Sequence, residues 1–239
     1  YYSFPMNEVY YVNICDAVSL RLTVDVDGTI YYGETFETTL ADRAARYVSQ
    51  GYEAQTDVAR LCIDLLRFSA AIQDYFGYTA QGLASEKILS EYASALPVND
   101  RQLEQPYSAR PDWVTSFSLV MDGSIGIRVY LADIDGDTGG YTVKATFTRD
   151  GSTVTKTYSY ADLPEESGVK FVFMDSLYSN ELGEGVTFTL YNNGVAQGDS
   201  FTYSAGRYAN RNVAKTDLGE GTVTRGQVCQ ALMNYGASA

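Results

Sequence analysis

The chain contains no histidine among its 239 residues, and this decides much of the chemistry open to it. Imidazole acid–base catalysis, histidine-ligated zinc and histidine-activated nucleophiles are excluded. The G-x-S-x-G pattern of hydrolases and the G-x-x-x-x-G-K pattern of phosphate loops do not occur either. The sequence therefore predicts a protein that is not an enzyme, with carboxylates as the only catalytic groups left to consider.

Carboxylates that hydrolyse glycosides work as a pair in a pocket, where one of them has a raised pKa. The candidates are Glu165, Glu166, Glu181 and Glu184. All four lie in segments rich in glycine and serine, which favour loops. We therefore expect these four side chains to be solvated and not to form a catalytic pair.

The one cluster with metal-ligand spacing is the acidic loop, which contains Asp133, Asp135 and Asp137. Alternate carboxylates in a tight loop can direct oxygen atoms at Ca²⁺. An EF-hand loop needs glycine at its sixth position and glutamate at its twelfth, whereas this loop has Thr138 and Lys144. A structural calcium ion is the only cofactor the sequence indicates, and a solvated loop between two strands stays open as the alternative.

Aromatic residues are the remaining candidates for ligand binding, since the chain has 21 tyrosines and a single tryptophan. Tyr130 and Tyr141 flank the acidic loop, Tyr158 and Tyr160 are two apart on a predicted strand, and Trp113 opens the strands of the second half. Exposed rings stack on sugars or anchor protein contacts. Packing of the same rings into the core is the alternative.

Charge and composition exclude further classes of protein. Lys plus Arg number 17 and Asp plus Glu number 30, a net charge of −13 that argues against binding nucleic acid. No apolar run approaches the roughly 20 residues of a membrane-spanning helix. The chain has three cysteines, of which Cys62 and Cys229 are predicted to be buried free thiols, and a bridge between Cys15 and Cys62 stays open.

The elements that must position these residues can be predicted from periodicity. Residues 9–26 are rich in β-branched and aromatic residues, with alternation at Val18, Leu20, Leu22 and Val24, and predict strands. The turn pair Asp27-Gly28 and the return strand 29–37 then predict a β-hairpin. Helical spacing follows, with Thr39 as a cap, and a second helix ends before Gly77. Residues 97–112 hold three of the five prolines and are interpreted as a linker.

The second half predicts short strands joined by tight turns, followed by a helix. The turn pairs are Asp122-Gly123, Asp150-Gly151 and Asn193-Gly194. Such a series is typical of an antiparallel sandwich. Thr224 and Gln227 have the spacing of a capping box at the start of the last helix.

Comparison of the chain with itself indicates an internal repeat with a period near 167 residues. The aligned pairs are Val18 with Val186, Phe36 with Phe201, and Cys62 with Cys229. The order strand, hairpin, strand, helix, helix recurs, and the first copy lacks its leading strands. We therefore predict an α+β protein of two units, each with an Ig-like, antiparallel β-sandwich part followed by helices. Residues 1–106 form a partial unit with a β-hairpin and helices, and residues 107–239 form the second unit.

Three segments resemble a known family. They are LLRFSAAIQDYFGYTAQGLAS, ALMNYGASA and SFSLVMDGSIGIRVYL. The first two resemble the LNYGAAAQxYFGYNTDNLAN segment of large repeat-containing surface and secreted proteins of Gram-positive gut anaerobes, and the third resembles a strand pair of the same family. The resemblance implies an extracellular, secreted or cell-surface module without catalytic function.

The function expected on these grounds is adhesion or binding of an extracellular host or neighbouring-cell protein, with immunoglobulin among the partners that a gut habitat implies. Two alternatives stay open. One is a carbohydrate-binding module attached to a secreted glycan-degrading enzyme, and the other is a structural spacer. Exposed coplanar aromatic rings would favour glycan, and a flat apolar patch with an open sheet edge would favour protein.

Overall fold

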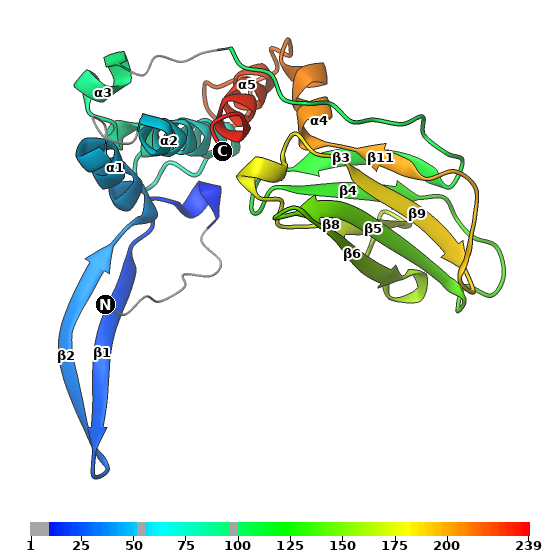
Figure 1. The fold of residues 1–239 in the computed structure, drawn as a ribbon, viewed down its shortest axis with the longest axis horizontal. Helices are drawn as coiled ribbons and strands as arrows, with labels where there is room; N and C mark the ends of the chain where they lie inside the picture. Colours follow the sequence, from blue (N-terminus) through cyan, green and yellow to red (C-terminus); the bar gives the residue numbers. More distant parts are fainter. Residues whose placement is uncertain (1–9, 52–55, 96–99) are drawn as a thin grey trace. The chain divides into compact units, whose positions relative to one another are not determined.

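A computed structural model of the chain describes residues 10–51, 56–95 and 100–239 (Figure 1). The chain divides into two compact units. Unit 1 comprises residues 1–98 with 219–223, and unit 2 comprises residues 99–218 with 224–239. Helices occur together with antiparallel sheets, which confirms the predicted α+β class. Among the helices of the described residues, none is long and apolar enough to cross a lipid bilayer.

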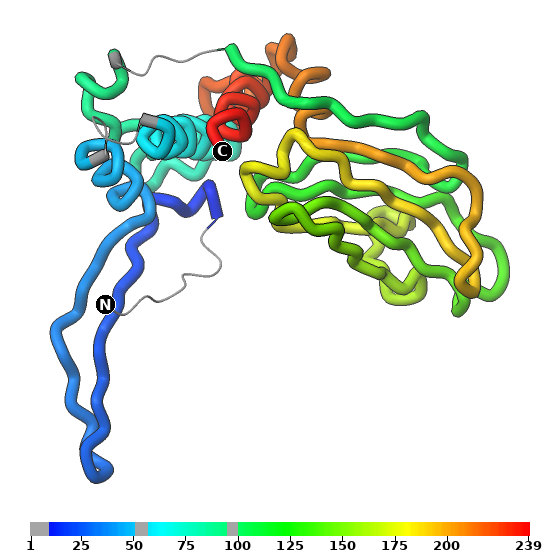
Figure 2. Tube along the Cα trace, viewed as in Figure 1, coloured from blue at the N-terminus to red at the C-terminus, as the bar shows by residue number. Residues whose placement is uncertain are grey.

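The described strands of unit 1 form an antiparallel hairpin, β1 Val18–Val26 and β2 Thr29–Thr38 (Figures 1 and 2). The turn residues Asp27 and Gly28 both have positive φ, 52° and 81°. A type I′ turn requires this conformation at both central positions, and Asp-Gly adopts it readily. The predicted hairpin is therefore confirmed for residues 18–38. The strand expected over 9–26 is wrong for residues 10–17, because Tyr11–Asn13 form a 3-10 helix and β1 begins at Val18; residue 9 lies outside the described residues. It extends away from the helices of its own unit as an isolated two-stranded sheet.

Helices form the core of unit 1. They are α1 Leu40–Gly51, α2 Thr56–Phe76 and α3 Ser90–Ala95, with the short 3-10 helices η1 Tyr11–Asn13 and η2 Ala84–Lys87. The hydroxyl of Thr39 accepts a hydrogen bond from the backbone N–H of Asp42 at 2.8 Å, which caps α1 as predicted. Gly77, with a φ of 78°, follows the end of α2. Buried residues of α1 and α2, such as Ala44 and Leu66, pack with Ile14.

Residues 219–223 belong to unit 1 although they lie far along the chain, and they bind the C-terminal end of α2. A carboxylate oxygen of Asp74 accepts hydrogen bonds from the backbone N–H groups of Thr222 and Val223, at 2.7 and 2.6 Å. A side chain at Gly219 would overlap the carbonyl of Tyr75, so the backbone approaches α2 closely here. Asp74 is thus the main polar anchor of this segment.

Replacing Asp74 by alanine is expected to release residues 219–223 and to lower the free energy of unfolding of unit 1 by about 1–3 kcal/mol, because two N–H donors lose their acceptor. Hydrogen–deuterium exchange at Thr222 and Val223 measures the release. Glu34→Ala, on the exposed strand β2, is the control. Unchanged exchange at both amides would contradict the anchoring role of Asp74.

Unit 2 contains two antiparallel sheets. One has the order β3-β4-β8-β7, with β3 Val114–Val120, β4 Gly126–Leu131, β7 Glu165–Glu166 and β8 Val169–Met174. The other has the order β10-β9-β5-β6, with β11 also paired to β9; its strands are β5 Tyr141–Arg149, β6 Ser152–Ser159, β9 Val186–Asn192, β10 Val195–Ala196 and β11 Phe201–Tyr203. The turns at Asp150-Gly151 and Asn193-Gly194 have positive φ throughout, as predicted for tight hairpins.

The two sheets of unit 2 contact each other through their apolar faces. Phe117 of β3 has its ring centroid 4.9 Å from that of Phe201 and 4.5 Å from that of Tyr203, both on β11. Val129 of β4 and Phe188 of β9 are fully buried. Alternating side chains of both sheets therefore form the core, as the strand pattern predicts.

Two helices complete unit 2, α4 Ala205–Asn212 and α5 Arg225–Gly236. The predicted capping box is confirmed, since Thr224 and Gln227 exchange hydrogen bonds at 2.8 and 3.2 Å. The 3-10 helices η3 Tyr160–Asp162 and η4 Ser179–Glu181 lie in the loops between strands.

The segment predicted as a linker packs along unit 2 from residue 100 onward. The ring of Tyr107 lies 6.4 Å from that of Phe201, and the Arg207 guanidinium lies 4.7 Å from the ring of Tyr107. Proline-rich composition indicates irregular backbone. Proline content does not indicate whether the side chains of such a segment pack on a domain. The linker interpretation is therefore wrong for residues 100–112.

Candidate functional site

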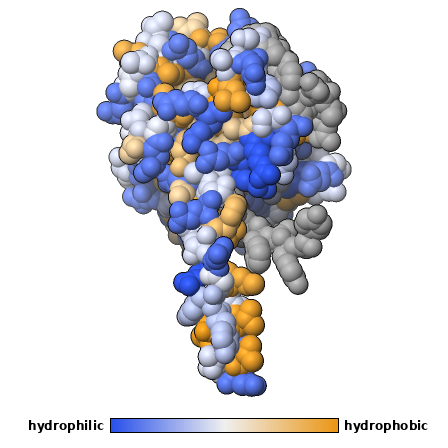
Figure 3. All heavy atoms as spheres, turned by 90° about the vertical axis from the view of Figure 1, so that its left-hand side faces the viewer, coloured by the Kyte–Doolittle hydropathy of each residue, from blue (hydrophilic) through white to orange (hydrophobic). Residues whose placement is uncertain are grey.

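The hairpin of unit 1 exposes a continuous row of large apolar side chains, which we call the apolar face of the hairpin. Its members are Leu20, Leu22, Val24, Val26, Tyr31 and Phe36, with exposed fractions between 37% and 66%. Leu20 pairs directly with Phe36, and Val24 pairs with Tyr31, so these residues share one face of the sheet. Figure 3 shows hydrophobic residues, in orange, gathered along one side of the hairpin.

The opposite face of the hairpin is more polar, although Ile30 and Tyr32 are exposed on it. Ser19 donates a hydrogen bond to Glu37 at 3.0 Å. The Arg21 guanidinium lies 4.5 Å from the ring centroid of Tyr32, and its Nε donates to the carbonyl of Gly33 at 3.0 Å. An antiparallel sheet with one apolar and one polar face is typical of a sheet that covers a core. Here the apolar face is exposed to solvent.

Unit 2 contains a strand pair with the same register, and its apolar face is buried. Leu20 pairs with Phe36 in unit 1, and the aligned residues Phe188 and Phe201 pair with each other in unit 2. Phe188 and Phe201 have no exposed surface, whereas Phe36 is 55% exposed. Each strand pair is followed by two helices, α1 and α2 in one unit and α4 and α5 in the other. Strand pairs of the same register are thus buried in unit 2 and exposed in unit 1.

The aromatic pair predicted on β6 does not form an exposed row. Tyr160 lies beyond the end of β6, is only 4% exposed, and its hydroxyl donates to the carbonyl of Ala132 at 3.4 Å. Tyr158 is half-buried, with its hydroxyl 4.0 Å from the sulfur of Met174. Burial raises the pKa of Tyr158 to about 12, with a further contribution from Asp175. Both rings follow the alternative of inward packing, since Tyr158 contacts Met174 of β8 in the other sheet and Tyr160 contacts Ala132, which follows β4.

Trp113 and Tyr141 are both half-buried. The indole N–H of Trp113 donates to the carbonyl of Asp199 at 2.9 Å, so its polar group is engaged within the unit. The ring centroid of Tyr141 is 6.4 Å from that of the buried Tyr160. The backbone N–H of Ala132 donates to the carbonyl of Trp113 at 2.9 Å, and the carbonyl of Ala132 accepts from Tyr160, so contacts link Trp113, Tyr160 and Tyr141. None of these three side chains is fully exposed, so they do not form an exposed aromatic row.

Among the predicted aromatic residues, Tyr130 belongs to a cluster of polar and aromatic side chains on the outer face of β4 and β8. Its hydroxyl donates to Glu166 at 2.7 Å, and Arg128 donates to the same carboxylate at 3.0 Å. The Arg128 guanidinium lies 4.5 Å from the ring centroid of Phe171 and 5.8 Å from that of Phe173. Sequence reasoning missed Arg128 and both phenylalanines. Arg128 and Tyr130 alternate in β4, and Phe171 and Phe173 alternate in β8. This alternation, considered for both strands together, is the sequence signal that would have placed all four on one face.

The acidic loop is exposed, with Asp133, Asp135 and Asp137 all facing solvent. Asp137 accepts a hydrogen bond from the backbone N–H of Gly139 at 2.9 Å, as in an Asx turn. Within residues 10–51, 56–95 and 100–239, no three acidic or cysteine side chains come together as a metal-binding group. The hydrogen bond to Gly139 explains an aspartate at position 137 without a metal ion. The calcium ion therefore stays an expectation from the sequence.

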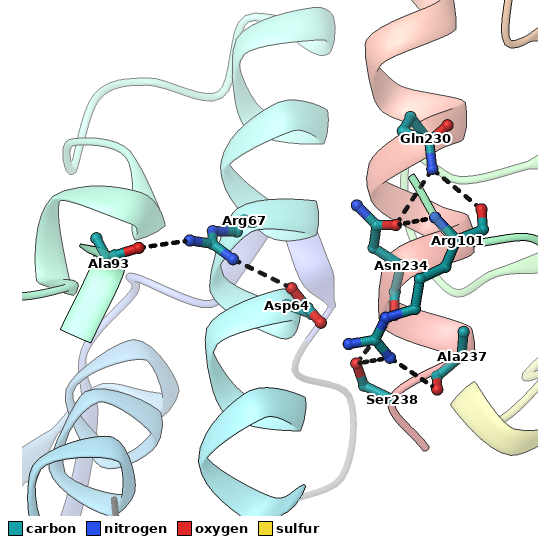
Figure 4. A network of polar contacts seen from close by, with 8 residues as sticks. All are labelled: Asp64, Arg67, Ala93, Arg101, Gln230, Asn234, Ala237 and Ser238. Carbon is teal, nitrogen blue, oxygen red and sulfur yellow. Dashed lines mark hydrogen bonds and ion pairs between the residues drawn. The ribbon is translucent and has the colours of Figure 1, made fainter. Parts of the chain in front are cut away.

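Figure 4 shows two polar networks, each of which stabilises one unit. In unit 1, Arg67 bonds Asp64 at 3.4 Å and the carbonyl of Ala93 at 3.5 Å, which ties α3 to α2. In unit 2, Arg101 donates from its side chain to the carbonyl of Ala237 and from its backbone to Asn234, at 2.9 and 3.0 Å. The second network satisfies carbonyl groups at the end of α5. Both arrangements hold neighbouring elements of a unit together.

Glu181 was expected to be solvated, and this prediction is wrong. It is 4% exposed and binds Arg149 through both carboxylate oxygens, at 2.5 and 2.8 Å. Burial acts to raise the pKa of Glu181, but the hydrogen bonds from Arg149 and from the Tyr178 backbone outweigh it and lower the pKa. Arg149 reaches this carboxylate from β5, a long-range contact that sequence spacing does not reveal. Glu165, Glu166 and Glu184 are exposed, as predicted.

The cysteines are free thiols, so the bridge between Cys15 and Cys62 does not form. Burial raises the pKa of Cys62, and it raises the pKa of Cys229 to about 12. A thiol with a raised pKa carries little of the reactive thiolate at neutral pH. These residues therefore contribute packing.

No protein-family model matches this chain, and searches of curated proteins and of solved structures give no significant match.

Proposed function

We propose that this chain is a non-catalytic binding module of a secreted or cell-surface protein, and that it binds a protein partner through the apolar face of the hairpin. The observation that carries the proposal is the row of six exposed apolar side chains on one face of β1 and β2. Exposed apolar patches of this kind mark interaction surfaces in soluble proteins. A two-stranded hairpin is also only marginally stable alone, so a partner stabilises it.

The composition of this face supports a protein partner over a glycan. Four of its six members are leucine or valine, which contribute apolar contact area without hydrogen bonds. Glycans present many hydroxyl groups and are bound by aromatic faces combined with polar groups. A flat aliphatic strip fits a second apolar protein surface better.

A carbohydrate-binding function is the second candidate, supported by the cluster of Arg128, Tyr130 and Phe171. Their rings and guanidinium group lie on the outer face of a sheet, where a sugar can approach. The rings of Tyr130 and Phe171 are tilted by 49° to each other, so they do not form one flat platform. The charged groups of the cluster also bond one another already. This cluster therefore supports glycan binding less well than the hairpin supports protein binding.

The finer fold is proposed on the same basis. The two antiparallel sheets of unit 2, packed through buried alternate residues, support an Ig-like sandwich. The hairpin of unit 1 corresponds to the last strands of such a sandwich.

The proposal predicts that protein binding depends on the apolar face and not on the polar face of the same strand. Purified extracellular proteins and a glycan array are tested in parallel against the wild-type chain, Leu22→Asp and Thr23→Asp. Leu22→Asp is expected to weaken binding of a protein ligand roughly tenfold or more, because it buries a charge in the contact. Thr23→Asp adds the same charge on the opposite face and should bind normally. Binding of glycans alone, or equal binding by both variants, would contradict the proposal.

A further inference from the structure

We propose that the apolar face of the hairpin packs against the same face of a second copy of this chain, so that two hairpins form a small β-sandwich. This inference rests on the proposed protein-binding function and names the partner. The contact involves only the hairpins, and the fold of both units stays the same in each copy.

Unit 2 indicates what kind of surface covers this face. The residues that align with Leu20 and Phe36 are Phe188 and Phe201, and a second antiparallel sheet buries both of them. That sheet presents apolar side chains such as Phe117. Stacked sheets lie about 10 Å apart with interdigitating apolar side chains. The occupant of the hairpin face should therefore be an uncharged apolar sheet.

The hairpin of a second copy has these properties. The six members of its apolar face are uncharged, so packing them face to face buries no ionised group among them. Glu34, at the register shift opposite Leu22, has to keep its carboxylate in solvent at the open edge of β2. The charged side chains of Arg21, Asp25 and Glu37 lie on the opposite face, because they alternate with the apolar row in β1 or pair with its polar positions. A two-fold axis through the centre of the contact makes the surface self-complementary. Leu22 and Val24, in the middle of β1, then occupy the centre.

The area of the face is sufficient for a specific dimer. Six side chains of these sizes, each about half exposed, present on the order of 600 Å² per copy, so a pair buries on the order of 1,200 Å² in total, at the lower end of specific interfaces. Each copy carries a net charge of −13, which opposes association. Salt screens this repulsion, and so the dimer should become tighter as ionic strength rises.

The test is sedimentation velocity of the 239-residue chain over a range of micromolar concentrations, at low and at high salt, with Leu22→Asp and Thr23→Asp as matched variants. We expect the wild-type mass to rise from one chain to two with concentration, and to do so at lower concentration in high salt. Leu22→Asp should weaken the dimer roughly tenfold or more, because each copy then places a charge in the contact. Thr23→Asp should dimerise like the wild type. Circular dichroism of both variants checks that the helices of unit 1 remain folded.

A wild-type chain that stays monomeric overturns the proposal, as does a dimer that Leu22→Asp leaves intact, which would place the contact at a strand edge or in another region. Equal loss of the dimer in both variants also overturns it, because added charge and not the apolar face would then be the cause. These results separate the inference from the proposed function. A monomeric chain that binds another purified protein through Leu22 retains the function, and a chain that does neither loses both.

Discussion

Phe188→Ala is expected to lower the free energy of unfolding of unit 2 by about 3–5 kcal/mol, because it leaves a large cavity in the core. Leu20→Ala, at the aligned position of the hairpin, is expected to cost the monomer less than about 1 kcal/mol, since exposed side chains contribute little. Phe188 is fully buried and pairs with Ala145 and Phe201, whereas Leu20 is 37% exposed. Corresponding positions of the two strand pairs are thus expected to differ strongly in their effect on stability.

Urea unfolding measures the difference. The single tryptophan, Trp113, lies in unit 2 and bonds Asp199 there, so its fluorescence follows the unfolding of that unit. Circular dichroism at low protein concentration follows the whole chain for Leu20→Ala. A loss of stability of similar size in the two variants would mean that the hairpin face is covered in solution and would contradict the structure of unit 1.

Glu181→Gln is expected to lower the free energy of unfolding of unit 2 by about 2–4 kcal/mol, since it removes the charge that faces Arg149 and leaves a buried pair incomplete. The guanidinium of Arg149 also lies 3.8 Å from the ring centroid of Tyr178 and donates to the carbonyl of Ser176 at 2.8 Å. Loss of the carboxylate therefore disturbs the link between β5 and the loop that contains η4. Glu184→Gln, the same change at an exposed site three residues later, is the control and should have little effect.

The pH dependence of stability follows from the same carboxylate. The folded state lowers the pKa of Glu181 below its ordinary value of 4.5, so the unfolded chain takes up a proton more readily. Its stabilising contribution is therefore complete above the ordinary value and is lost as the pH falls through the lower, folded-state pKa. Urea unfolding of the wild type and Glu181→Gln should differ most at neutral pH and converge in acid. A difference that stays constant with pH would show that the charge of Glu181 is not responsible.

Short-range chemistry determined the turns and helix ends of this protein, so these could be predicted from the sequence. Asp27-Gly28 and Asn193-Gly194 adopt the positive φ values that tight hairpins need. Thr39 and Thr224 cap the helices that follow them. Each of these features depends on residues within four positions of one another, and so no knowledge of the rest of the chain is required.

Only the tertiary structure decided how each side chain is used. Glu181, in η4, is buried where Arg149 of β5 binds it, and Tyr160 faces inward where its hydroxyl meets the carbonyl of Ala132. Leu20 and Phe188 have equivalent places in a strand pair, and alternation alone assigns both to an apolar face. Whether such a face is buried depends on a second sheet lying opposite it. That contact joins distant parts of the chain in unit 2, and in the described residues of unit 1 no sheet supplies it.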